Sequence, residues 1–173
     1  LREMIAGRYQ KRLGLKVNPD EIQIVNGSQQ ALDLTAKILT NPGDTILIER
    51  PGYLGAIEAF SFYTTDFCPV APDAEGPDPS VLKEQLRKKR NAFFYGIPNS
   101  QNPSGLTWSL DRRKEVAELL ATSDCLFYED DAFGELFFDG RPRTPVMQVL
   151  PDQVILSGSF SKIIAPGLRI GWV

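Results

Sequence analysis

The chain has 173 residues, of which 42% are hydrophobic and 24% are charged, as in an ordinary globular protein that buries its own core. Its 19 basic and 22 acidic residues leave a formal charge of −3, which does not favour a polyanionic partner. Histidine is absent, which excludes Ser-His-Asp and Cys-His nucleophilic machinery, His-ligated zinc and haem, and histidine acid–base catalysis.

The predicted elements alternate between helices and strands along the chain. In order, apolar spacing and turn residues predict a helix over 2–13, a strand over 22–25, a helix over 29–39, a strand over 45–48, a helix over 53–60, a strand over 65–70, a helix from 79 into the basic run 87–90, a strand over 92–97, a helix over 109–120, and strands over 125–128, 154–156 and 169–173. This alternation predicts a three-layer α/β/α architecture around a mostly parallel sheet of seven strands.

The cysteines and the chain ends bear on the compartment and the extent of the protein. Cys68 and Cys125 stand alone in apolar stretches and form no Cys-x-x-Cys motif, which indicates buried thiols in a reducing compartment. No apolar run approaches the roughly 18 residues of a membrane span, and no signal peptide opens the chain. We expect a cytoplasmic protein with no membrane partner. Leu1 and Val173 fall inside predicted elements, so we expect an internal fragment of a longer chain.

Polar groups follow the first and fourth predicted strands, where ligands of such sheets bind. Gly27, Ser28 and Gln29 open a helix, and free backbone N–H groups there would bind an anion such as a phosphate. The alternative is a Ser28 cap that serves only the helix. After the fourth strand, Asn102 stands before a proline and could present its amide to a ligand, unless the loop is only a turn.

Charged groups follow the fifth and sixth predicted strands. The carboxylates of 129–131 would repel one another without a cation, and both a cation site and a plain acidic helix start stay open. Lys162 stands among small hydroxyl residues and apolar neighbours, and a lysine in such surroundings can form a Schiff base. Arg169 adds a fixed cation for a phosphate. An amine, an acid, an amide and an anion site together are the set that pyridoxal phosphate (PLP) requires.

With these motifs in order, the sequence resembles the fold type I PLP-dependent aminotransferases of class I/II, nearest the 2-aminoadipate and multi-substrate branch. The resemblance covers essentially the whole chain and is carried by 159–162 with 166–169, by 102–105 and by 129–131. It implies that residues 1–173 are the PLP-binding large domain, without the small domain that supplies an arginine for the substrate carboxylate.

The resemblance also implies residue roles. Lys162 would form the Schiff base and later move the proton, and Asp130 would pair with the pyridine nitrogen of PLP. Asn102 would bond the phenolic oxygen of the ring, and Tyr53 would stack on the ring. The phosphate would be held by Gly27, Ser28, Gln29, Ser159, Ser161 and Arg169. The plain alternatives are a core aromatic for Tyr53 and a turn residue for Ser161.

One position departs from the family pattern. The family usually has a tyrosine three residues after the pyridine-binding aspartate, donating to the same phenolic oxygen, and this chain has Phe133. The missing hydroxyl removes a hydrogen bond of about 1 kcal/mol, so we expect altered activity.

The activity implied by the resemblance is amino transfer between an L-amino acid and a 2-oxo acid, by a homodimer in the full-length protein. The fragment alone is not expected to turn over substrate, and no metal or direct nucleic-acid binding is expected of it. Three alternatives stay open. They are another PLP reaction on the same scaffold, such as a lyase or decarboxylase, a PLP-sensing effector domain of a transcription regulator, and an α/β binding domain without PLP.

Overall fold

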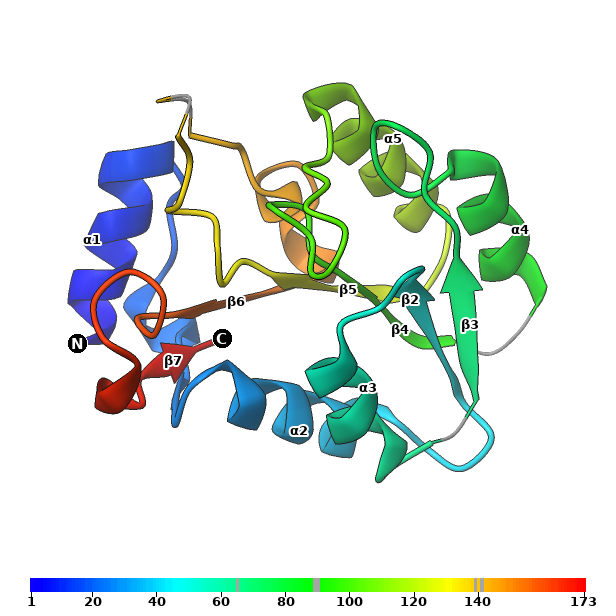
Figure 1. Ribbon diagram of the computed structural model, residues 1–173, viewed down its shortest axis with the longest axis horizontal. Coiled ribbons are helices and arrows are strands. Elements are labelled where there is room, and N and C mark those ends of the chain that lie inside the picture. Colours follow the sequence, from blue (N-terminus) through cyan, green and yellow to red (C-terminus); the bar gives the residue numbers. More distant parts are fainter. Residues whose placement is uncertain (65, 89–90, 139, 141) are drawn as a thin grey trace.

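One seven-stranded sheet runs through the molecule in the order β1-β7-β6-β5-β4-β2-β3 (Figure 1). The computed structural model describes residues 1–64, 66–88, 91–138, 140 and 142–173. The strands are β1 (Ile24–Val25), β2 (Thr45–Glu49), β3 (Phe67–Val70), β4 (Asn91–Gly96), β5 (Leu126–Asp130), β6 (Val154–Ser159) and β7 (Gly171–Trp172). Strands β3, β2, β4, β5 and β6 pair in parallel, whereas β7 is antiparallel to both β6 and β1. The prediction of a mostly parallel sheet is confirmed.

Helices cover both faces of this sheet, which confirms the three-layer architecture. They are α1 (Arg2–Leu13), α2 (Ser28–Leu39), α3 (Leu54–Ser61), α4 (Pro79–Lys88) and α5 (Leu110–Leu120). Helices α2 and α3 lie on one face, and α1, α4 and α5 lie on the other (Figure 1). Residue 65 of the predicted third strand and residues 89–90 of the predicted basic helix end lie outside the described residues. Within those described ranges, no helix combines the length and the apolar character that crossing a membrane requires.

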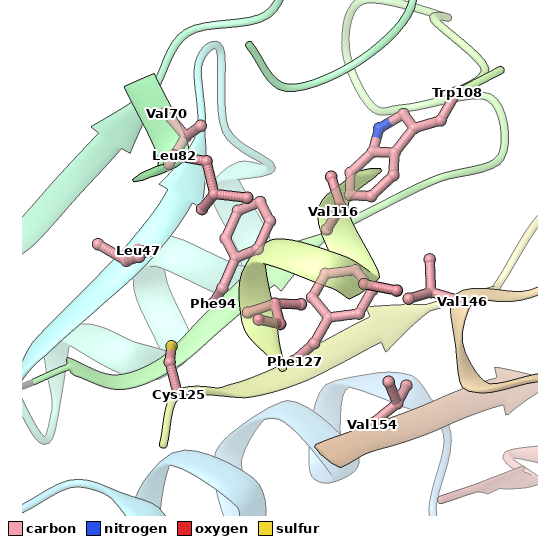
Figure 2. Close-up of a cluster of buried hydrophobic side chains, with 12 residues drawn as sticks. Leu47, Val70, Leu82, Phe94, Trp108, Val116, Cys125, Phe127, Val146 and Val154 are labelled. Carbon is pink, nitrogen blue, oxygen red and sulfur yellow. The ribbon is translucent and has the colours of Figure 1, made fainter. Parts of the chain in front are cut away.

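The central strands are continuous apolar runs because both of their faces are buried. Phe93 and Phe94 are neighbours in β4 and point to opposite faces, Phe93 toward the α2 and α3 side and Phe94 toward the α4 and α5 side. Figure 2 shows Phe94 and Phe127 projecting from neighbouring strands into the hydrophobic cluster on the α4 and α5 side, with Phe94 next to Leu82. Burying one such side chain stabilises the fold by about 1.5–3 kcal/mol.

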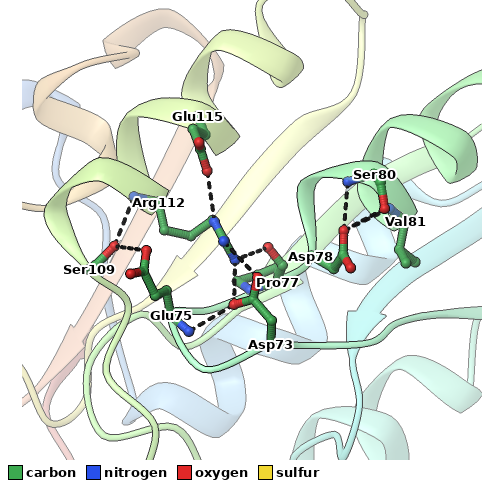
Figure 3. Close-up of polar contacts among 9 residues, drawn as sticks. All are labelled: Asp73, Glu75, Pro77, Asp78, Ser80, Val81, Ser109, Arg112 and Glu115. Carbon is green, nitrogen blue, oxygen red and sulfur yellow. Dashed lines mark hydrogen bonds and ion pairs between the residues drawn. The ribbon is translucent and has the colours of Figure 1, made fainter.

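A polar contact ties the loop before α4 to α5 on the outer side of this core. The Arg112 guanidinium donates to both carboxylate oxygens of Asp73, at 2.8 and 2.7 Å, and to the Pro77 carbonyl at 2.7 Å (Figure 3). Glu115, one turn further along α5, accepts from the same guanidinium at 2.9 Å. These bonds to Arg112 lower the pKa of Asp73 to about 2. We call this contact the Asp73–Arg112 clamp.

Candidate functional site

The carboxyl ends of the parallel strands meet around a cavity of about 70 Å³. Its lining residues are Ser28, Tyr53, Ile97, Asn102, Asp130, Ala132, Phe133 and Lys162. Five of the predicted site residues therefore come together from five separate segments of the chain. A larger hollow of about 460 Å³ lies elsewhere, next to Trp172 and Val173, and none of the predicted site residues lines it. We regard the smaller cavity as the functional one, because it gathers the charged and polar groups.

Asp130 is the acid of the cavity. It is the last residue of β5 and is only 4% exposed. The Tyr95 hydroxyl donates to its Oδ2 at 2.8 Å, and the Ala132 N–H donates to Oδ1 at 3.3 Å. Burial raises the pKa of Asp130, although these hydrogen bonds act against the increase. Among the described residues, no lysine or arginine forms an ion pair with Asp130. Such a carboxylate favours a cationic partner from a ligand.

The three consecutive carboxylates do not act as one cluster. Strand β5 extends through Asp130, two residues beyond the predicted end, so Glu129 and Asp130 point to opposite faces of the sheet. Glu129 accepts the backbone N–H groups of Val146 and Met147, both at 3.0 Å. No group of three or more possible metal ligands was found in the part of the chain that the structure describes. The alternative of an acidic helix start is wrong, because turns follow β5 rather than a helix.

Asp131, the third of these carboxylates, has its own donor. Its Oδ1 accepts from the Asn99 amide at 2.6 Å. Asn99 in turn accepts from the Arg113 guanidinium at 2.8 Å. Burial raises the pKa of Asp131 to about 6, while the Asn99 bond opposes the increase. This side chain is therefore committed to a structural contact beside the cavity.

Lys162 lies in the turn after β6 and is the amine of the cavity. Lys162 is exposed, and of the apolar residues that follow it Ile163 is half-buried and Ile164 is 63% exposed. The Lys162 Nζ lies 6.0 Å from the centre of the Phe133 ring. The amine is thus accessible at the cavity mouth.

Tyr53 and Asn102 complete the cavity wall. Tyr53 precedes α3 and is half-buried against the α2 and α3 cluster while also lining the cavity. Burial, with smaller contributions from the Asp130 and Glu58 carboxylates, raises the pKa of its hydroxyl. Asn102 is half-buried in the loop after β4, and its peptide bond to Pro103 is cis. The amide and the aromatic ring therefore face the same cavity from two different loops.

The N-terminus of α2 forms the side of the site that suits an anion. Gly27 caps the helix without a side-chain bond and Ser28 is its first residue, so the alternative of a Ser28 cap is wrong. The first N–H groups of a helix lack intrahelical acceptors. Arg169 approaches this end, and its Nη2 donates to the Asn26 carbonyl at 3.2 Å. The backbone at Gly27 has a φ of +84°, which residues with a side chain rarely adopt. A Cβ atom there would also lie 2.7 Å from Nη2 of Arg169, so only glycine suits this position.

The remaining predicted phosphate ligands lie near this end but do not line the cavity. Ser159 faces Gly171 in the β6–β7 pairing, and Gly171 approaches the backbone of Gly27. The Ser159 hydroxyl donates to the Ile170 carbonyl at 3.3 Å and accepts from the Ser161 N–H at 3.1 Å. The exposed Gln29 side chain donates to the Gly55 carbonyl at 2.7 Å, which leaves its backbone N–H for an anion.

Two functional residues are absent from the sequence prediction. Tyr95 holds Asp130, but it lies in an apolar run and is typical of a core residue. Glu49 ends β2 and is buried, although an acid after a strand is typical of a surface position. Its carboxylate accepts from the Ile97 N–H at 2.6 Å and from the Trp108 indole N–H at 2.9 Å. The only available signal is a polar residue directly at the end of a buried strand.

Comparisons with known proteins agree with this geometry. Residues 1–173 match the family described as aminotransferase class I and II. Aromatic-amino-acid aminotransferase 1 of Thermococcus litoralis is 39% identical to this chain over 100% of its length and 43% of the relative's own length. The crystal structure of Pyrococcus horikoshii kynurenine aminotransferase, in complex with PMP, KYN and KYA, superposes with a TM-score of 0.92 at 40% identity, covering 99% of this chain and 44% of that chain.

Regulators are also among the relatives. An uncharacterized HTH-type transcriptional regulator of Escherichia coli, YdcR, is 35% identical over 100% of this chain and 37% of its own length. The chain thus spans less than half the length of the curated relatives it matches. The match over all 173 residues shows that the chain belongs to the class I and II aminotransferase family.

Proposed function

We propose that this chain is the PLP-binding large domain of an aminotransferase that exchanges an amino group between an L-amino acid and a 2-oxo acid. The observation that carries the proposal is the cavity in which Lys162, Asp130, Asn102 and Tyr53 meet. The family match supports it. The substrates, the reaction and the assembly of the whole protein belong to the same proposal.

The residues of the cavity fit PLP. When bound, PLP supplies an electron sink for the negative charge that develops at the substrate α-carbon. Asp130 is a buried carboxylate without a described cationic partner, which suits the protonated pyridine nitrogen of this cofactor. By keeping that nitrogen charged, Asp130 would preserve the sink. Tyr53 would stack on the ring, and the Asn102 amide would donate to its phenolic oxygen.

The anionic end of the cofactor fits the N-terminus of α2. The backbone N–H groups of Ser28 and Gln29 supply donors, and glycine at position 27 lets Arg169 approach closely. The Ser161 hydroxyl would add a further bond, and the Ser159 hydroxyl would do so by turning away from the Ile170 carbonyl. Arg169 supplies a permanent positive charge beside the helix terminus, which favours a phosphate over a neutral group.

Lys162 would transfer the proton in the reaction. Its amine would hold the cofactor at rest and would be free once substrate is bound. The free amine of Lys162 would then remove the proton from the substrate α-carbon as a base and return it as an acid. The accessible position of Lys162 at the cavity mouth supports this role.

The test is to add PLP to the purified protein, reduce with borohydride and map the modified peptide by mass spectrometry. We expect a pyridoxyl group on Lys162 that disappears in Lys162→Ala. Lys114→Ala is the matched control, because Lys114 is exposed and forms an ion pair with Asp111 at 3.5 Å on α5. Modification scattered over surface lysines in the full-length protein would refute the proposal.

A second function, a PLP-sensing effector domain of a transcription regulator, is favoured by the regulator YdcR among the relatives. Phe133 in place of a tyrosine supports the same candidate, since a sensor does not need efficient turnover. PLP bound at Lys162 in the full-length protein, with no amino transfer to any tested 2-oxo acid, would favour it. A lyase or decarboxylase reaction would instead consume the amino acid without transferring its amino group to a 2-oxo acid.

We also propose that the full-length protein is a homodimer. Three apolar side chains are exposed next to site residues, namely Leu54, Ile164 and Leu168. Exposed apolar side chains beside a site suit the surface of a second copy. A cytoplasmic location and the lack of nucleic-acid binding by this segment stay predictions, and sedimentation of the full-length protein tests the dimer.

A further inference from the structure

We propose that Glu49 is a positioning residue that fixes the loop carrying Asn102 to the end of β2, and so sets the spacing between Asn102 and Tyr53 across the cavity. The inference rests on the proposed function, because that spacing is the one a bound PLP ring would need. Glu49 itself does not line the cavity.

Glu49 holds both ends of the loop that runs from Ile97 to Trp108. Its Oε2 accepts from the N–H of Ile97, the first residue after β4, at 2.6 Å. Its Oε1 accepts from the indole N–H of Trp108 at 2.9 Å. The Trp108 backbone N–H donates to the Pro98 carbonyl at 2.9 Å, so the two ends of the loop are also joined to each other. Asn102 lies at the far side of this closed loop.

A second contact ties the middle of the loop to the same segment. The Gln101 amide donates to the Pro51 carbonyl at 2.7 Å, and Gln101 is buried. Gln101 directly precedes Asn102, and Pro51 lies two residues before Tyr53. The contacts at Glu49 and Pro51 therefore fix the loop from two directions, and both depend on the end of β2.

Only a carboxylate matches the donors that face position 49. Both donors are uncharged N–H groups, and a carboxylate offers an acceptor oxygen to each of them. A glutamine offers one oxygen and one NH₂ group, so one donor would face another donor. The surrounding core holds the Trp108 ring in place, because the ring is 1% exposed and stacks on Phe94 and Phe127.

The burial of Glu49 is unfavourable in itself, which argues for a positional role. No described lysine or arginine forms an ion pair with this side chain. Burial raises its pKa to about 7, although both of its hydrogen bonds oppose the increase. An uncompensated buried acid is a poor source of stability. Its effect lies in the placement of the two segments that it joins.

The experiment measures the dissociation constant of PLP for the whole protein by absorbance titration, together with the Tm. We expect Glu49→Gln to raise the Kd by about tenfold or more, as the loop shifts relative to Tyr53. In the double variant Glu49→Gln/Trp108→Phe, the indole donor is gone, so the glutamine oxygen can serve Ile97 without a conflict. The double variant should therefore bind PLP as tightly as Trp108→Phe alone.

Leu82→Ala is the control for a general loss of stability. Leu82 belongs to α4, and its side chain is fully buried against the sheet in the cluster of Figure 2. We expect this variant to lower the Tm while the Kd for PLP stays the same.

Two results would overturn the inference while the proposed function stands. One is a wild-type protein that binds PLP at Lys162 and a Glu49→Gln variant that binds it equally well. The other is a double variant whose loss of PLP binding free energy equals the sum of the losses in Glu49→Gln and Trp108→Phe. A wild-type protein that gives no adduct at Lys162 would overturn both the proposed function and the role of Glu49.

Discussion

Asp73 and Glu49 each use both carboxylate oxygens to join two segments, but they do so with opposite chemistry. Asp73 lies on the outer side and accepts from the charged Arg112 guanidinium, which lowers its pKa to about 2. Glu49 lies near the cavity and accepts only from neutral N–H groups, and burial raises its pKa to about 7. The difference teaches that an acid on the outer side is held by a cation of the chain itself. Glu49 and Asp130 form no ion pair with a described lysine or arginine, and of these two only Asp130 lines the cavity, where a cationic ligand could pair with it.

The largest expected effect comes from breaking the Asp73–Arg112 clamp with Arg112→Ala. Arg112 is almost completely buried, and its removal leaves the Pro77 carbonyl without this donor and Asp73 without its cation, although Asp73 still accepts from the Glu75 N–H at 2.8 Å. We expect the free energy of unfolding to fall by about 2–3 kcal/mol, measured by urea denaturation, because the buried Pro77 carbonyl loses a charged donor while Asp73 stays half-exposed. The Kd for PLP should stay within about twofold, since the clamp lies outside the cavity. A loss of less than about 1 kcal/mol would contradict the importance of this contact.

The pH dependence of stability separates the two kinds of acid. Burial raises the pKa of Glu49 and Glu129 from 4.5 to about 7, so the folded protein binds protons that the unfolded chain releases. The unfolding free energy should therefore fall as the pH rises from about 4.5 to 7, by on the order of 3 kcal/mol per group at most. Asp73 acts in the opposite direction, because its stabilisation is lost as the pH falls from 3.8 toward 2.

Urea denaturation between pH 5 and pH 8 would check this dependence. Glu129→Gln should flatten the slope, since the amide does not titrate. A stability that rises with pH across this interval would show that the two buried glutamates do not control it.

Tyr95→Phe tests whether a neutral donor positions Asp130 as neutral donors position Glu49. The variant removes the hydroxyl that donates to Oδ2 and leaves a buried ring in place. We expect a weakening of PLP binding by about fivefold, which corresponds to about 1 kcal/mol. Tyr63→Phe is the matched control, because Tyr63 donates to Asp33 at 2.7 Å and neither residue lines the cavity. Equal Kd values for the two variants would show that the Tyr95 hydroxyl does not contribute to PLP binding.

The smallest expected effect comes from Phe133→Tyr, which adds one neutral donor to the cavity wall. The new hydroxyl would restore the donor that the family usually has, so PLP should bind more tightly by up to about fivefold. Absorbance titration measures the change, and the spectrum of the bound cofactor should shift as its phenolic oxygen gains a bond. An unchanged spectrum would show that the side chain at position 133 points away from that oxygen.

The sequence predicts the order of the elements well, because strands buried on both faces are apolar over most of their length. It misplaces the end of β5, because Glu129 and Asp130 are polar and hide the continuing strand. The backbone there still pairs with β6, with Asp130 opposite Ser157. Polarity near a strand end therefore does not mark where the hydrogen-bonded ladder stops.

The site is predictable only in part, for a related reason. The residues that line the cavity follow strands directly, and the topology of a parallel sheet brings such positions together. Glu49 and Tyr95 instead act through contacts across 48, 59 and 35 residues of sequence. Local patterns do not reveal which side chains meet over such separations.

The pairing of β1 with β7 has a consequence for synthesis of the protein. Asn26, at the start of the anion-binding end, meets Arg169 from 143 residues later in the chain. At a synthesis rate of about 5–20 residues per second, roughly 7 to 30 s separate the emergence of these two partners from the ribosome. In a nascent chain the N-terminus of α2 would thus be synthesised long before Arg169, which lies beside it in the folded protein. A cofactor that needs both groups would therefore bind only after the strands between them have been translated.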